Sequence, residues 1–187
     1  MRSIGRWGVV ALVVGVGVLG ASRGARPAGR DALAPADAAA DIAALRAEIE
    51  QLKGRLPDQS HVMKDVGYHF ANLWFAGRAG NWPLAGFYLA ETRSHLRWAV
   101  RVIPVRKTKA GDVDLRTILD GLERTVFADA QRAVEGKSPE AFARAYQAAL
   151  AGCYSCHVAS DKPFLRPHVP TEPEARIIDF APAASGQ

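Results

Sequence analysis

The only two cysteines of this 187-residue chain lie three positions apart, and a histidine follows the second one directly. Cys153, Cys156 and His157 form the pattern C-x-x-C-H, which is the attachment signature for c-type haem. The two thiols would add to the two vinyl groups of one porphyrin, and the imidazole would supply one axial ligand to the iron. The pattern therefore predicts one covalently attached haem c, with two thioether cysteines and His157 as axial iron ligand.

Other uses of two close cysteines fit this sequence less well. A redox-active dithiol usually opens a helix within a βαβ pattern, whereas here the pair closes the last helix of an all-α pattern. A structural zinc site needs more ligands, and the chain has no further cysteine. A simple disulfide would leave the adjacent histidine without a reason.

The N-terminus has the features of an export signal. A short basic lead is followed by an apolar run over residues 8–21, which is shorter than the roughly 20 residues that a membrane-spanning helix needs. We expect residues 1–25 to be a signal peptide or, if uncleaved, a membrane anchor, and the body of the protein to lie in the periplasm, tethered to the inner membrane by residues 8–21 in the uncleaved case. Without the three arginines of residues 1–25, 21 basic residues face 19 acidic ones, so the sequence gives no support to nucleic-acid binding.

Residues 26–57 are expected to hold a linker, rich in Ala, Gly, Pro and Arg up to residue 40, and then a short amphipathic helix. Its apolar residues follow the 3, 4, 3, 4 spacing of a coiled coil over about two heptads. Two interpretations stay open: a helix that packs on its own domain, or a stalk that forms a homo-oligomer through residues 42–56. The apolar residues are Ile42, Leu45, Ile49, Leu52 and Leu56.

Residues 58–160 carry four stronger helical patterns and no strand pattern of comparable length. Short connections between them predict an all-α, antiparallel up-down four-helix bundle, with the C-x-x-C-H motif on its last helix. Asn81 and Ser138 are expected helix caps. The expected helices cover 58–77, 82–103, a span from Asp112 or Asp114 to about 136, and 138 onward. Residues 161–187 are rich in proline, so they cannot be helical throughout, and their apolar residues suggest that this extension lies against the bundle.

A helical bundle with C-x-x-C-H on its C-terminal helix resembles the cytochrome c′ superfamily, the class II c-type cytochromes. The resemblance covers about residues 58–160, and the stretch "HVMKDVGYHFANL" is similar to the family's first helix, which crosses the far side of the haem. The family usually continues with further helix after the histidine, where this chain has its proline-rich extension.

The resemblance implies that the residue opposite His157 decides the function. It places Met63 near the sixth iron position, where a thioether would close the site and raise the reduction potential. The alternatives are that Met63 only fills core space, that His69 or another histidine (His61, His95 or His168) is the sixth ligand, or that the iron is five-coordinate.

These alternatives lead to two functions. A closed site implies a periplasmic electron carrier that docks with a redox partner protein or a membrane respiratory complex. An open site implies a gas-binding haem protein for nitric oxide or carbon monoxide. A basic run between residues 93 and 109 could be a solvated surface, pair with haem propionates, or dock an acidic partner. No catalytic motif is present, so we do not expect an enzyme.

Overall fold

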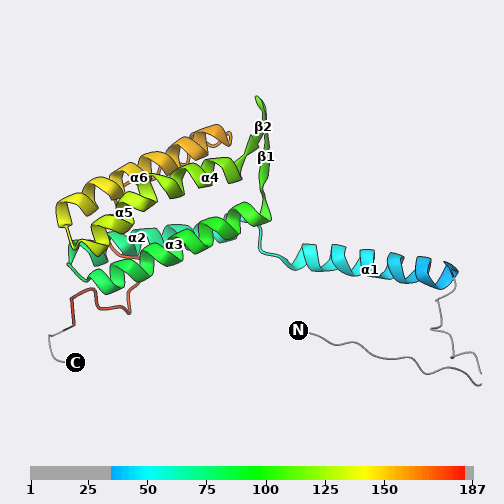
Figure 1. Cartoon of the computed structure of the whole chain (residues 1–187), viewed down its shortest axis with the longest axis horizontal. Helices are drawn as coiled ribbons and strands as arrows, with labels where there is room; N and C mark the ends of the chain where they lie inside the picture. The colour runs from blue at the N-terminus through cyan, green and yellow to red at the C-terminus, as the bar shows by residue number, and fades with distance from the viewer. Residues whose placement is uncertain (1–34, 184–187) are drawn as a thin grey trace, which may run out of the picture. The chain divides into compact units, whose positions relative to one another are not determined.

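The computed structural model describes residues 35–183, which are mostly helical, as expected for an all-α protein. Figure 1 shows the element order. The helices are α1 (Pro35–Arg55), α2 (Gln59–Arg78), α3 (Trp82–Val102), α4 (Leu115–Arg124), α5 (Val126–Glu135) and α6 (Pro139–Ala159). Two short strands, β1 (Val105–Thr108) and β2 (Gly111–Asp114), lie between α3 and α4. The predicted signal or anchor segment of residues 1–25 lies outside the described residues.

Helix α1 is longer than the sequence indicated. Residues 35–40 were expected to belong to the linker, but they form its first turns. The apolar residues of its coiled-coil pattern are between 49% and 57% exposed. Self-association through residues 42–56 therefore stays a prediction.

The other helices surround one core. Helix α2 contacts α3, α3 contacts α5, α5 contacts α6, and α6 contacts α2, so four helical segments close a ring. Aromatic side chains fill its centre: Phe70 stacks on Tyr146, whose hydroxyl donates to the Phe70 carbonyl oxygen at 3.0 Å. Phe127 and Phe142 are fully buried beside them. Burial of these large aromatic side chains stabilises the packing of the four helical segments.

Polar side chains start the helices where the sequence indicated. Asp58 accepts from the backbone N–H of His61 at 2.9 Å and caps α2, and this bond lowers the pKa of Asp58. Asn81 caps α3 by accepting from Leu84 at 3.3 Å. Ser138 caps α6 in the same way through Ala141. Each cap satisfies a backbone donor that the first helical turn leaves without a partner.

The expected third helix is in fact two helices. Thr125 has φ −114° and ψ −95°, which is not helical, and its hydroxyl donates to the Gly121 carbonyl oxygen at 2.8 Å. Two adjacent β-branched residues, Thr125 and Val126, favour a break here because their side chains are restricted within a helix. The chain restarts as α5 with Phe127 fully buried.

The segment after α3, expected to be a short connection between two helices, forms a β-hairpin. Strands β1 and β2 are antiparallel, with Val105 opposite Asp114 and Thr108 opposite Gly111. Gly111 has φ +127°, a backbone conformation that glycine adopts at little cost. The strands are short and polar, so the sequence has no apolar alternation that would have indicated them.

The proline-rich extension lies against the helices, as the sequence indicated. Ala175 is buried, and its backbone N–H donates to the Asn72 side-chain oxygen at 3.0 Å. The Phe180 ring lies 6.1 Å from Phe75 and 6.2 Å from Tyr88, centroid to centroid. Other apolar residues of the extension do not anchor it: Phe164 and Ile177 are strongly exposed, and Leu165 and Ile178 are also exposed.

The close approach of α2 and α6 at Gly77 gives a stability prediction. A Cβ at Gly77 would overlap the Phe142 ring, whereas a Cβ at Gly67 on the same helix meets nothing within 4 Å. We expect Gly77→Ala to lower the free energy of unfolding by about 1–3 kcal/mol. Gly67→Ala should instead raise it by up to ~1 kcal/mol, because alanine is the better helix former. Urea denaturation of both variants checks this; equal stability of the two would contradict the packing.

The buried bond from Ala175 to Asn72 gives a second prediction. Asn72→Ala would leave the Ala175 N–H buried without an acceptor, and we expect a loss of about 1–3 kcal/mol in stability. Limited proteolysis should also cut the extension faster. Asp179→Ala is the matched control, because it removes only an exposed bond to the Ala181 N–H. Equal cleavage rates in both variants would show that Asn72 does not anchor the extension.

Candidate cofactor-binding site

A cavity of about 560 Å³ collects the residues that the motif singled out. Cys153, Cys156 and His157 lie on its wall from α6, and Met63 lies on its wall from α2. A volume of this size is typical of a pocket for an organic cofactor. The remaining wall is largely apolar, and its apolar side chains come from α3, α4 and the extension: Leu96, Ala99, Val100, Leu115, Ile118, Leu119, Leu122, Leu165 and Pro167.

The proline-rich extension orients His157. The Nδ1 atom of His157 lies 2.8 Å from the carbonyl oxygen of Leu165. A carbonyl oxygen can only accept, so Nδ1 carries the hydrogen and donates it. With the hydrogen on Nδ1, Nε2 is the nitrogen of this ring that can bind a metal. Nothing in the sequence indicated that a carbonyl group eight residues further on would fix this imidazole.

The two cysteines are free thiols in an apolar setting. Burial raises the pKa of Cys153 to about 11, and it also raises the pKa of Cys156. Cys156 also stands in the last turn of α6, where the helix dipole disfavours negative charge. A redox-active dithiol needs a lowered pKa. The surroundings therefore do not favour thiolate redox chemistry. This agrees with the sequence pattern, which a redox-active dithiol fits less well.

Cationic side chains complete the cavity. Lys64, Arg106, Lys162 and Arg166 belong to its wall, and none of the described lining residues is acidic. The β-hairpin positions Arg106, whose guanidinium donates to the Gln59 side-chain oxygen. An apolar pocket with basic groups on its wall suits a flat apolar ring system that carries carboxylates, and haem with its two propionates is such a molecule. On both chemical grounds the residues present fit a haem group.

The structure separates the candidates for a sixth ligand. Met63 is partly buried on the cavity wall, in the helix stripe whose other members, Val66, Phe70, Leu73 and Gly77, are buried. Of the five histidines, only His157 lines the cavity. His69 lies instead beside His95, with ring centroids 4.8 Å apart. The structure thus gives the His69 alternative no support.

Two residues of the basic run have another role. Arg93 and Arg97 of α3 both pair with Glu123 of α4, at 2.6 and 2.9 Å, and so link the two helices. Only Arg106 of this run lines the cavity. Lys162 and Arg166 at the cavity come from the extension, and their role was missed because it depends on how that irregular segment folds back.

Within residues 35–183, no helix combines the length and apolar character that crossing a membrane requires. Comparison with known proteins found no matching family model, no matching curated protein and no matching solved structure.

Proposed function

We propose that this chain is a monohaem c-type cytochrome that transfers electrons. Cys153 and Cys156 would hold the haem through thioether bonds, and Nε2 of His157 would be an axial ligand. The observation that carries the proposal is the apolar cavity whose wall includes both cysteines, His157 and Met63. When bound, the haem supplies an iron that cycles between the ferric and ferrous states and so carries one electron.

The chain's own residues would perform four tasks. The Leu165 carbonyl oxygen holds the His157 ring with Nε2 free. The leucines of α4 exclude water from the ring system. Met63 is the proposed sixth ligand, because it is the remaining side chain on the wall with a soft donor atom. Lys64 and Arg106 would offset the propionate charges.

The proposal extends to the fold and the location of the protein. The ring formed by α2, α3, α4 with α5, and α6 would be a four-helix bundle like that of the cytochrome c′ superfamily. Residues 1–25 would direct export to the periplasm, where covalent haem attachment takes place. The partner would be a redox protein or a membrane respiratory complex, and residues 42–56 would allow self-association.

The decisive experiment is an absorption spectrum of the purified protein, oxidised and reduced, with and without carbon monoxide. We expect a c-type spectrum from haem that stays with the polypeptide in a denaturing gel, low-spin iron, and no response to carbon monoxide. Absence of covalent haem after expression with a haem-attachment system would overturn the cytochrome proposal. Covalent haem that is high-spin and binds carbon monoxide would keep the cytochrome and replace electron transfer by gas binding.

A further inference from the structure

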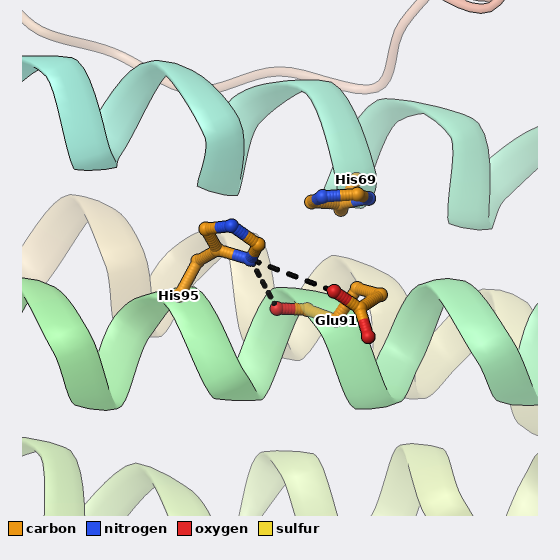
Figure 2. Close-up of side chains that lie close together, drawn as sticks. All are labelled: His69, Glu91 and His95. Atoms are coloured by element: carbon orange, nitrogen blue, oxygen red, sulfur yellow. Dashed lines mark hydrogen bonds and ion pairs between the residues drawn. The ribbon is translucent and has the colours of Figure 1, made fainter.

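Three metal-ligating side chains meet between α2 and α3, outside the cavity. His69 extends from α2, and Glu91 and His95 stand one helical turn apart on α3, as Figure 2 shows. One donor atom from each residue lies within 4.8 Å of the other two. All three side chains are partly buried, which distinguishes this cluster from fully solvated groups on a protein surface.

The hydrogen bonds of this cluster leave nitrogen atoms that can bind a metal. His95 Nδ1 lies 2.9 Å from the Glu91 carbonyl oxygen and 3.9 Å from a Glu91 carboxylate oxygen (Figure 2). Nδ1 therefore donates to this carbonyl oxygen, which leaves Nε2 as the nitrogen of His95 that can bind a metal. His69 Nδ1 is buried and has no hydrogen-bond partner. A buried polar atom without a partner is costly, and a bound ion would relieve that cost.

Negative charge and aromatic rings surround His69. Burial lowers the pKa of His69, and the neighbouring His95 lowers it further. The carboxylates of Glu91 and Asp65 raise the pKa of His69, because their negative charge lies close to the ring. The rings of Tyr68 and Tyr88 pack against His69. An imidazole nitrogen and a carboxylate oxygen that lie side by side are common ligands of one metal ion.

We propose that His69, Glu91 and His95 bind one divalent transition-metal ion of the Zn²⁺ class, with water completing the coordination. Two imidazoles and one carboxylate are the ligands of many three-residue zinc sites. Ligands of a tetrahedral zinc ion lie about 3.3 Å apart at Zn–N bonds of ~2.0 Å. Donor atoms that lie up to 4.8 Å apart must therefore approach one another by up to about 1.5 Å, and rotation of the partly exposed Glu91 side chain contributes to this. The ion would join α2 to α3 and is independent of the haem proposal.

The test is calorimetric titration of the chelator-treated full-length protein with ZnCl₂. We expect one equivalent to bind, and His69→Gln or His95→Gln to weaken binding by more than about tenfold. Because the ion binds only the folded chain, Zn²⁺ at 100 times its Kd should raise the Tm by about 5–10 °C. His69→Gln should lose this rise. The matched control is His168→Gln, which removes an exposed histidine of the extension and should change neither result.

A second arm separates this site from the thiols. The same titration in a Cys153→Ser, Cys156→Ser background removes any zinc binding by free cysteines. Retention of one equivalent there, and its loss on adding His69→Gln, would support the proposal. It would be overturned if wild-type protein binds no Zn²⁺, or if binding is the same in His69→Gln and His95→Gln as in wild type.

Discussion

Replacing Cys153 and Cys156 together by serine is expected to abolish covalently bound haem. A serine hydroxyl does not form the thioether bond that the C-x-x-C-H motif provides. The His157 ring and the apolar wall would remain, so any haem that still enters would be held only by axial ligation and packing. Acidified organic solvent should then extract all haem from the variant and none from the wild-type protein, as read from the absorbance of the two phases.

The control for this prediction lies between the two cysteines. Ser155 is exposed, and its hydroxyl donates to the Ala151 carbonyl oxygen within α6. Ser155→Ala should therefore keep wild-type levels of covalent haem. If the double-serine protein kept haem that survives extraction, the two cysteines would not be the attachment residues and the proposed function would fail.

The second large effect is expected at Met63. Leucine has a similar volume but no donor atom, so Met63→Leu should leave the fold intact and open the sixth iron position. We expect the ferric protein to change from low to high spin and the ferrous protein to bind carbon monoxide. The reduction potential should fall on the order of 0.1 V, a fraction of the ~0.8 V range that axial ligands set. Visible spectra and a redox titration measure both changes.

His69 supplies the comparison for Met63. It lies on the same helix but does not line the cavity, so His69→Gln should leave the haem spectrum and the response to carbon monoxide unchanged. An unchanged spectrum in Met63→Leu would remove Met63 as a ligand. A spectral change in His69→Gln alone would mean that α2 is rotated relative to the structure described above.

The parts of the fold that local chemistry determines could be predicted from the sequence. Asn81 and Ser138 start helices because a side-chain oxygen three residues before a free N–H can reach it in any tertiary setting. The 4, 3, 4 spacing of Val66, Phe70, Leu73 and Gly77 also predicts one buried face, since the helical period alone sets it, and all four residues are buried. The C-x-x-C-H motif identified three residues of the cavity wall, because these residues lie within five consecutive positions of the sequence.

Features that depend on contacts between distant segments could not be predicted. The break at Thr125 lies within an apolar pattern that continues on both sides, so the period gave no sign of it. The hairpin that carries Arg106 has strands too short and polar for an alternating pattern. The contact of His69 with His95 requires knowing how α2 packs on α3, although the spacing of Glu91 and His95 on one helix face was a signal that could have been followed.

The extension has a consequence for conformational entropy. Residues 161–183 of the extension form no helix or strand, and their contacts with the helices include one buried hydrogen bond and the Phe180 ring. Its prolines restrict the backbone before it docks, so less freedom is lost on docking, by about 0.4–1 kcal/mol for each proline. These prolines are Pro163, Pro167, Pro170, Pro173 and Pro182. Substituting them by alanine would remove no backbone N–H donor and would still loosen the segment that holds His157, because the entropic cost of its order would increase.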